Sequence, residues 1–331
     1  MIIEEVIIIG CGPCGMSAAL ELKKYNIDPL IIEKGNIVDT IHSYPTHQTF
    51  FSSSNKLEIG ETPFISSKHK PVRHEALAYY REVAKRSKLR INAFETVNNA
   101  KKKKNSFIVN TTDKFGNEKL YKTNYLIIAT GYHDQPNLLN IPGSSLSHVS
   151  HYFKEAHPYF RQKTTVIGGR NSAIDTALEL YHANADVTVI YRGSEYSKSI
   201  KPWILPEFAS LVKHGKIKMI FNAEVTKITE DKLHYQIGDK QLTEQIDFVF
   251  AMTGYHPQVN FLQNLDVEVD THTGKPEYNP ESYETNINNL YIAGVIISGF
   301  NGNETFIENG RHHGYYIAKS IYLNKENNIE V

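Results

Sequence analysis

The chain has 331 residues, a length typical of about two domains. Hydrophobic residues make up 40% of it and charged residues 22%, as in a globular protein with sizeable cores. Lys plus Arg and Asp plus Glu are equal at 36 each, which disfavours a protein that coats nucleic acid or a membrane surface.

The N-terminus and the hydropathy pattern predict a cytoplasmic protein. No apolar run approaches the roughly 20 residues that cross a bilayer. Glu4 and Glu5 precede the apolar run at 6–9, where a secretory signal would carry Lys or Arg before a longer apolar stretch. We therefore expect no membrane and no nucleic acid among the partners, and a reducing compartment. We also expect a homo-oligomer.

The first predicted unit consists of a strand, a glycine-rich turn, a helix and a second strand. Residues 6–9 are typical of a buried parallel strand, and a helix is predicted from Met16. The strand at 30–33 ends in Glu33, close to the offset expected for a carboxylate that binds a ribose hydroxyl. The turn matches the G-x-G-x-x-G pattern of dinucleotide-binding units and reads Gly10-Cys11-Gly12-Pro13-Cys14-Gly15.

The same turn contains the only two cysteines of the sequence, in the Cys-x-x-Cys spacing of disulfide oxidoreductases. A helix N-terminus lowers a thiol pKa, but each charge of a pyrophosphate about 5 Å away would oppose a thiolate by roughly 3 kcal/mol. A nearby cation such as Lys34 would offset that repulsion. Cys14 is therefore either a redox-active thiol or a small packing residue. Cys11 is either its resolving partner or incidental.

A second unit of the same kind follows later in the chain, and such a repeat predicts two dinucleotide-binding halves. Its strands are expected at 165–167 and 187–190, with a helix at 174–181. Arg170 stands where the second motif glycine is expected. Either the nucleotide lies further out, or the guanidinium contacts a phosphate itself. The turn reads Gly168-Gly169-Arg170-Asn171-Ser172-Ala173.

The second strand of this unit ends in Tyr191-Arg192 and not in an acid. An acid there would select NAD through the ribose diol, whereas a cation suits the 2′-phosphate of NADP. Arg192, helped by Lys198, is the candidate for that contact. The alternative is a solvated arginine on a loop.

Two apolar strands close the halves, and each ends in a Thr-Gly turn. These turns are Thr130-Gly131 and Thr253-Gly254. The segments at 94–125 and 216–247 read as hairpins, which predicts an antiparallel β-meander inserted before each closing strand.

Near the C-terminus, an apolar strand at 289–293 ends at Gly294-Val295. A helix is predicted to start around Glu304–Ile307 and to run through Ser320. Its N-terminus would point at whatever lies beyond that strand.

The order of these motifs resembles the flavoproteins with two dinucleotide-binding domains, in their short, thioredoxin-reductase-like form. The resemblance implies FAD on the first domain and NADPH on the second. The expected fold is α/β, with two Rossmann-like domains, each with an inserted antiparallel β-meander, and with the NADPH domain inserted into the FAD domain. The expected boundaries are 1–140 and 258–331 for the FAD domain and 141–257 for the NADPH domain.

Four long strings are similar to a narrower group, the bacillithiol-disulfide reductases (also called YpdA or Bdr). They lie at 33–36, 44–54, 152–160 and 196–206. The nicotinamide-domain Cys-x-x-Cys of thioredoxin reductases is absent, and Val295 follows Gly294 where those enzymes carry an aspartate. The narrower group has its characteristic cysteine at the place of Cys14, and usually has glycine at the place of Cys11.

The resemblance implies an enzyme, an NADPH-dependent FAD oxidoreductase that reduces a low-molecular-weight disulfide, here bacillithiol disulfide. Cys14 is the candidate catalytic residue, and no metal is expected. Two alternatives stay open: a ferredoxin– or flavodoxin–NADP reductase, and a flavin-based redox sensor. The expected FAD ligands are Gly10, Gly12, Pro13, Cys14, Gly15, Glu33, Lys34, Thr46, His47, Gln48, Thr130, Gly131, Gly294, Val295, Thr305 and Phe306. The expected NADPH ligands are Gly168, Gly169, Arg170, Asn171, Ser172, Arg192, Lys198, Thr253 and Gly254.

Overall fold

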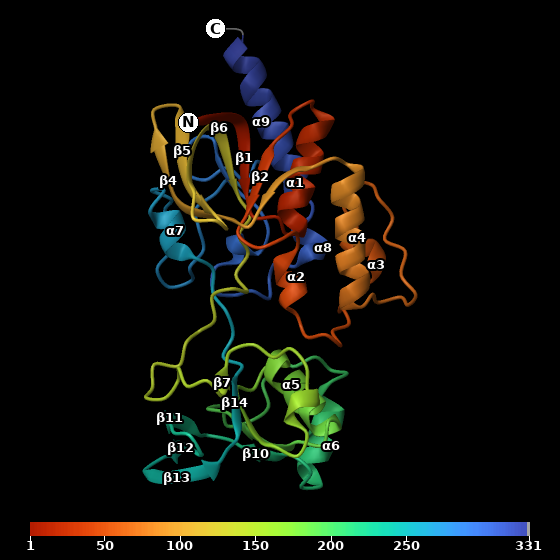
Figure 1. Ribbon diagram of the computed structural model, residues 1–331, viewed down its shortest axis with the longest axis vertical. Helices are drawn as coiled ribbons and strands as arrows, with labels where there is room; N and C mark the ends of the chain where they lie inside the picture. Colours follow the sequence, from red (N-terminus) through yellow and green to blue (C-terminus); the bar gives the residue numbers. More distant parts are fainter. Residues whose placement is uncertain (330–331) are drawn as a thin grey trace. The chain divides into compact units, whose positions relative to one another are not determined.

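The computed structural model describes residues 1–329, and the chain divides into two compact units (Figure 1). The first unit combines Met1–Gln135 with Tyr255–Val331, and the second is Pro136–Gly254. The chain thus leaves and re-enters the first unit a few residues earlier than the expected boundaries at 140 and 257. The assignment of one cofactor to each unit stays a prediction.

The first unit is built on a seven-stranded sheet. Its order is β3-β2-β1-β6-β5-β4, and β15 also pairs with β6. The pairs β1–β2, β2–β3, β1–β6 and β6–β15 are parallel, so these strands end at one edge of the sheet. The strands are β1 (Ile2–Ile9), β2 (Leu30–Glu33), β3 (Arg90–Ala93), β4 (Glu95–Lys103), β5 (Ser106–Asp113), β6 (Glu118–Ile128) and β15 (Leu290–Ile292).

The hairpins predicted at 94–125 form as the antiparallel strands β4, β5 and β6. Their third strand, β6, is itself the closing strand beside β1, because one long strand pairs with β5 at its start and with β1 along most of its length. In β1, Val6 and Ile8 lie in one core, and Ile7 and Ile9 in another. This is the pattern of a parallel strand buried on both faces.

Helices cover one face of this sheet. Buried residues of α1, α4 and α9 form one core with β1, β2 and β6. The helix α1 starts at Pro13, earlier than predicted from Met16, because proline is preorganised for the first helical position. Cys14 therefore lies in the first turn. The helices are α1 (Pro13–Lys24), α2 (Asp39–Ser43), α3 (Ser54–Leu57), α4 (Arg73–Arg86), α7 (Val259–Gln263), α8 (Ile307–Gly310) and α9 (His313–Ile329), with a 3₁₀ turn, η2 (Val295–Ser298).

The C-terminal helix predicted as one element is two, because the chain breaks between α8 and α9 at Arg311 and His312. The Arg311 carbonyl accepts a hydrogen bond of 2.6 Å from the Ser17 hydroxyl. The Arg311 guanidinium donates to the carbonyls of Asn55 at 2.9 Å and Glu58 at 2.6 Å. Through these bonds, Arg311 connects α1 and the region of α3 to the C-terminal segment.

The second unit has a parallel sheet of order β10-β9-β8-β14-β7 and a separate antiparallel sheet of order β11-β12-β13. The predicted meander at 216–247 is therefore only partly right, since its first strand, β10, pairs with β9. The helix α5 starts earlier than the predicted residue 174. The elements are β7 (Val149–Ser150), η1 (His157–Tyr159), β8 (Lys163–Ile167), α5 (Asn171–His182), β9 (Asp186–Ile190), α6 (Leu205–Lys213), β10 (Lys218–Ile220), β11 (Glu224–Ile228), β12 (Lys232–Ile237), β13 (Lys240–Gln245) and β14 (Phe248–Ala251).

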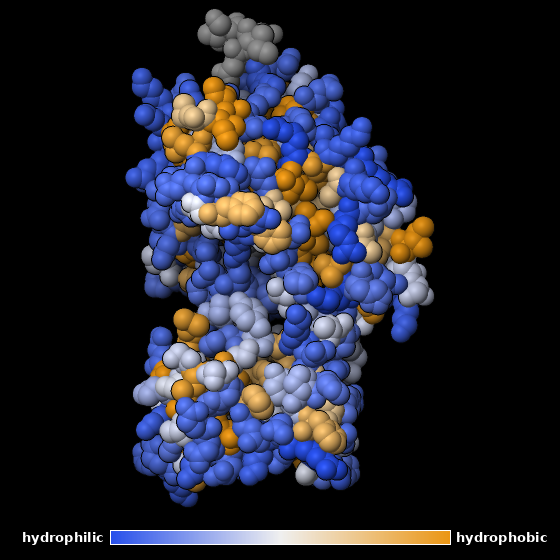
Figure 2. Space-filling model, in the orientation of Figure 1, coloured by the Kyte–Doolittle hydropathy of each residue, from blue (hydrophilic) through white to orange (hydrophobic). Residues whose placement is uncertain are grey.

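The surface seen in Figure 2 is mostly hydrophilic, with scattered apolar side chains. Among residues 1–329, no helix combines the length and the apolar character needed to cross a membrane.

Candidate functional site

In the first unit, the glycine-rich turn after β1 packs against the end of β6. Gly10 has φ +105°, and a Cβ there would lie 2.5 Å from the Ala129 carbonyl oxygen. A Cβ on Gly15 would lie 2.1 Å from the Gly10 carbonyl oxygen. A Cβ on Gly12 would meet nothing within 4 Å. Gly10 and Gly15 are therefore required by packing, and Gly12 leaves space for a ligand.

Two further observations fit a dinucleotide with a pyrophosphate, such as the expected FAD. The N-cap of α1 is Gly12, so no side chain caps the helix, and its first N–H groups suit an anion. The Thr130 hydroxyl is buried, and it has no hydrogen-bond partner in the described part of the chain. A ligand hydroxyl or phosphate would satisfy it. Thr130 follows β6 at the same sheet edge as the turn.

Glu33 ends β2 and is only 8% exposed. Its Oε2 accepts the Cys11 N–H at 2.7 Å, and its Oε1 accepts the Gly35 N–H at 2.8 Å. Burial raises the pKa of the carboxyl, and the two backbone bonds oppose that shift. The carboxylate is thus held in one orientation, with lone pairs left for ribose hydroxyls. Lys34 forms an ion pair with Asp134.

The Cys14 sulfur lies against two glycines from the C-terminal part of the chain. A Cβ on Gly294 would lie 3.1 Å from Sγ, and a Cβ on Gly310 would lie 2.9 Å from it. Burial raises the pKa of the Cys14 thiol to about 12. The thiol is therefore protonated at neutral pH. Lys34, expected to offset the repulsion of a thiolate, is instead engaged by Asp134.

Cys11 is fully buried in the core of the first unit, and both cysteines are free thiols. Burial, with a smaller contribution from Glu33, raises the Cys11 pKa above its usual range. The contacts of Cys11 use its backbone, because its N–H donates to Glu33 and its carbonyl accepts from the Val38 N–H at 2.9 Å. These contacts favour the interpretation of its thiol as incidental.

His313 holds the turn after β15, a role that the sequence did not reveal. Its Nδ1 accepts the Gly294 N–H at 3.1 Å, and its ring stacks on Tyr283 with centroids 4.2 Å apart. Burial, with a contribution from His312, lowers the His313 pKa to about 4. The imidazole is therefore neutral and carries its proton on Nε2.

The other expected C-terminal ligands differ in position. Val295 begins η2, directly after Gly294. Thr305 is buried, and its Oγ1 lies 2.6 Å from the Ser298 hydroxyl. Its methyl group lies beside Gly310, so it belongs to the surroundings of Cys14. Phe306 is exposed.

Thr46, His47 and Gln48 lie on the loop between α2 and α3, and the first two are exposed. The loop reaches the residues after Gly131, because the Tyr44 ring contacts the His133 ring with centroids 5.5 Å apart. No spacing in the sequence indicated that contact.

In the second unit, the turn after β8 meets the residues after β14 and β9. A Cβ on Gly168, which has φ +140°, would lie 2.5 Å from the Met252 carbonyl oxygen. A Cβ on Gly169 would lie 2.4 Å from the Tyr191 ring. Arg170 is the N-cap of α5, and no side chain caps this helix either. The turn therefore presents uncapped N–H groups to an anion.

Asn171 joins the start of α5 to the segment that carries Lys198. Its Oδ1 accepts the Lys201 N–H at 2.8 Å, and its Nδ2 donates to the Ser199 carbonyl at 3.0 Å. Ser172 is exposed.

The cations expected to contact NADPH are available to a ligand. Arg170, Arg192 and Lys198 are exposed, and no ion pair joins them to a carboxylate in the described part of the chain. Thr253 donates its hydroxyl to the Asn137 carbonyl at 2.6 Å, and the Gly254 carbonyl accepts the Asn137 N–H at 2.9 Å. This turn is thus held by a residue that the sequence did not mark.

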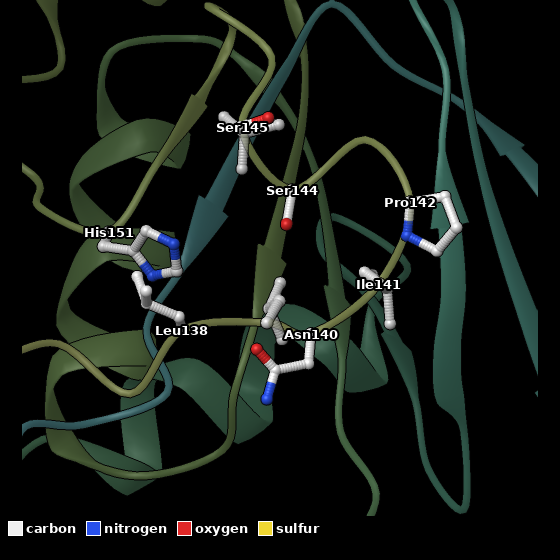
Figure 3. A pocket seen from close by; sticks show the side chains of 9 residues that line it. Leu138, Asn140, Ile141, Pro142, Ser144, Ser145 and His151 are labelled. Atoms are coloured by element: carbon white, nitrogen blue, oxygen red, sulfur yellow. The ribbon is translucent and has the colours of Figure 1, made fainter.

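A hollow of about 490 Å³ lies along residues 138–151 of the second unit (Figure 3). Its lining is formed by a single short segment, which includes Leu138, Ile141, Pro142 and His151. None of the predicted ligands lines it. Within residues 1–329, no three His, Cys, Asp or Glu side chains gather as metal ligands.

Comparisons with known proteins agree with this architecture. The family model described as pyridine nucleotide-disulphide oxidoreductase matches residues 7–294. The chain is 56% identical to the bacilliredoxin reductase Bdr of Bacillus subtilis, over 97% of this chain and 98% of the relative. The solved bacillithiol disulfide reductase Bdr (YpdA) from Bacillus cereus is 56% identical, with a TM-score of 0.96 and coverage of 97% and 99%.

The protein of the same name from Staphylococcus aureus is 55% identical, with a TM-score of 0.93 and coverage of 98% and 100%. The prediction of the family and of the fold class is confirmed. The chain is an enzyme of the pyridine nucleotide-disulphide oxidoreductase family and belongs, within it, to the Bdr (YpdA) reductases.

Proposed function

We propose that the chain is an NADPH-dependent FAD oxidoreductase that reduces bacillithiol disulfide to two molecules of the thiol. The observation that carries the proposal is the likeness to Bdr over almost the whole chain. The B. subtilis relative is named for a bacilliredoxin, whereas the two solved structures are named for the small disulfide. For this chain we propose the small disulfide. We also propose a cytoplasmic homo-oligomer.

The first unit would hold FAD. The uncapped start of α1 and the space at Gly12 would receive the pyrophosphate, and the fixed Glu33 carboxylate would bind the ribose. The buried Thr130 hydroxyl would gain the partner it lacks among the described residues. When bound, FAD supplies the transfer of an electron pair from NADPH to the disulfide.

The second unit would hold NADPH. The uncapped start of α5 would receive the pyrophosphate, and Arg192 with Lys198 would contact the 2′-phosphate. Arg170 would lie against the phosphates, since it is the exposed N-cap residue of that helix. β9 is followed by Tyr191 and Arg192 and not by an acidic residue, which would select NAD by binding the ribose diol.

Cys14 would take part by thiol–disulfide exchange. Its sulfur would attack one substrate sulfur, form a mixed disulfide, and release the other half as a thiolate that takes up the Cys14 proton. The electron pair from NADPH, together with one proton from solvent, would then cleave the mixed disulfide, restore the Cys14 thiol and release the second thiol. Because burial raises the Cys14 pKa to about 12, deprotonation would have to accompany the attack.

The test is NADPH oxidation by the purified FAD-loaded protein with three acceptors: bacillithiol disulfide, an oxidised bacilliredoxin and a flavodoxin. We expect turnover that depends on bacillithiol disulfide. Preference for the flavodoxin would contradict the proposal and favour an NADP reductase, and negligible turnover with every acceptor would favour a redox sensor.

The role of Cys14 is tested with the Cys14→Ala variant. Loss of disulfide turnover in this variant, with unchanged flavin reduction by NADPH, would support thiol exchange. Full turnover in that variant would remove Cys14 from the reaction.

A further inference from the structure

Tyr191 occupies the place in the second unit that Glu33 occupies in the first. In both units, the N–H of the first turn glycine donates to a carbonyl near the end of the second strand. The acceptor is Ile32 in the first unit, at 2.9 Å, and Ile190 in the second, at 3.0 Å. The residue after this acceptor is Glu33 in the one unit and Tyr191 in the other. Tyr191 therefore stands where an acid that binds the ribose is expected.

The half-buried Tyr191 ring packs against two glycines. A Cβ on Gly169, in the turn, would lie 2.4–2.6 Å from the Cγ, Cδ1 and Cδ2 atoms of the ring. A Cβ on Gly193 would lie 2.4 Å from Cε1, 2.7 Å from Cζ and 3.0 Å from the hydroxyl oxygen. Neither glycine has a positive φ, so the backbone conformation does not require glycine at either position. The ring requires it, because a side chain at either position would overlap the ring.

The backbone is fixed on both sides of Arg192. The Tyr191 N–H donates to the carbonyl of Ile220, the last residue of β10, at 2.9 Å. The Gly193 carbonyl accepts the Asn222 N–H at 3.0 Å. Arg192 lies between these two bonds, and its side chain is exposed. The Tyr191 ring therefore connects the glycine turn to a backbone segment that holds Arg192 in place.

A phenol ring and a carboxylate at this place favour different nucleotides. In the first unit, the Glu33 carboxylate accepts the N–H of the second turn residue, Cys11, at 2.7 Å and keeps lone pairs for a ribose diol. In the second unit, the second turn residue is Gly169, and the Tyr191 ring packs on it. The ring has no carboxylate oxygens to accept a ribose diol and no charge to repel a phosphate near Arg192. It therefore favours a nucleotide with a 2′-phosphate.

We propose that Tyr191 is a positioning residue that sets the coenzyme preference of the second unit. This rests on the proposed function, in which that unit binds NADPH. The ring keeps the glycine turn, which receives the pyrophosphate, at a fixed spacing from Arg192, which contacts the 2′-phosphate. The packing of the ring carries this role, and its hydroxyl does not, because Gly169 and Gly193 both pack on ring carbons.

The test measures the dissociation constants of NADP⁺ and NAD⁺ by isothermal titration calorimetry. The oxidised, FAD-loaded full chain is used, so that binding is measured without turnover. The variants are Tyr191→Ala, Tyr191→Phe and Tyr191→Glu, with Tyr181→Ala as the matched control. Tyr181 is another half-buried tyrosine of the second unit, but it lies at the opposite end of α5 from the glycine turn.

We expect Tyr191→Ala to weaken NADP⁺ binding by about tenfold, because the charge-assisted contact of Arg192 loses its fixed position. NAD⁺ binding should change by less than about threefold, since NAD⁺ has no 2′-phosphate for that contact. Tyr191→Phe keeps the ring and should restore the NADP⁺ affinity that Tyr191→Ala loses. The control should match the wild type with both nucleotides.

Tyr191→Glu should reverse the preference. Its carboxylate recreates the arrangement at Glu33 and should tighten NAD⁺ binding by about three- to tenfold through the ribose diol. The same charge should weaken NADP⁺ binding by more than about tenfold, because it repels the 2′-phosphate.

Equal weakening of both nucleotides in Tyr191→Ala would show that the ring only supports the turn and would overturn the proposal, as would unchanged constants. A Tyr191→Phe variant as weak as Tyr191→Ala would assign the effect to the hydroxyl and overturn it too, as would an unchanged preference in Tyr191→Glu. A wild type that binds NADP⁺ no more tightly than NAD⁺ would refute the NADPH dependence of the proposed function itself. That outcome is read from the wild type alone, so the two failures are distinguishable.

Discussion

At the scale of single residues, the glycine turn shows what a sequence can reveal. The pattern predicted a cofactor turn at Gly10–Gly15, and the close approaches of Gly10 and Gly15 explain two of its glycines. The surroundings of Cys14 could not be predicted, because Gly294 and Gly310 are remote in the chain and nothing marks them as partners of a cysteine. The role of His313 could not be predicted for the same reason, because it contacts Gly294 from a distant position in the chain.

The contact between Cys14 and Gly310 can be tested by a double-mutant cycle. Gly310→Ala places a methyl group 2.9 Å from the Cys14 sulfur and should lower the free energy of unfolding by about 1–3 kcal/mol. Cys14→Ala removes that clash, so the double variant should recover about 1 kcal/mol or more relative to the sum of the single changes. Urea unfolding measures this, and strictly additive effects would contradict the described contact.

His313 should affect cofactor retention. His313→Leu leaves the buried Gly294 N–H without an acceptor, at a loss of about 1–3 kcal/mol, and should weaken FAD binding by about tenfold or more. His313→Gln keeps an acceptor for the Gly294 N–H and should restore part of the lost FAD affinity. His312→Leu, at the exposed neighbour, is the control. Equal FAD dissociation constants in all three variants would remove this role.

The same histidine predicts a pH dependence. Its folded pKa of about 4 lies below the ordinary 6.5, so the unfolded state binds more protons between these values. Its contribution to stability is therefore present above pH 6.5 and is lost as pH falls toward 4, by up to about 3 kcal/mol. His313→Gln should flatten the fall in unfolding free energy over this range. A slope equal to that of the wild type would contradict the assignment.

At the scale of elements, the apolar runs in the sequence predicted the positions of the strands well. The sequence patterns predicted the ends of the helices less well. The sheet strands β1, β2, β8, β9 and β14 all form where the pattern indicated. Both nucleotide-site helices begin three residues before the predicted start, because their first turns belong to the glycine motifs. The break between α8 and α9 depends on Ser17 and Arg311, and a pattern within one segment does not report such a distant contact.

The end of β9 carries a prediction about coenzyme choice. Arg192→Ala should raise KM for NADPH by about tenfold or more, because a charge-assisted phosphate contact contributes roughly 1.5–3 kcal/mol. KM for NADH should change little, since NADH lacks the 2′-phosphate. Steady-state kinetics with both coenzymes measure this. Equal changes for the two coenzymes, or an unchanged KM for NADPH, would place the phosphate elsewhere.

At the scale of the whole molecule, the repeated motif predicted two dinucleotide-binding units, and the resemblance to two-domain flavoproteins implied that one is inserted in the other; the chain does divide in this way. In each unit, parallel pairing brings strands that are far apart in sequence to one edge, and this is why the motifs meet there. Asn137, which holds the Thr253–Gly254 turn, lies close to where the chain passes from the first unit to the second. It belongs to no motif, so only the fold revealed it.

Flavin absorbance of the purified protein, followed without oxygen, tests the proposed function. We expect a yellow protein whose flavin is bleached by NADPH much faster than by NADH. Added bacillithiol disulfide should then restore the flavin colour and release two thiols for each NADPH oxidised. A protein that takes up no FAD, or a bleached flavin that bacillithiol disulfide does not reoxidise, would contradict the proposed function.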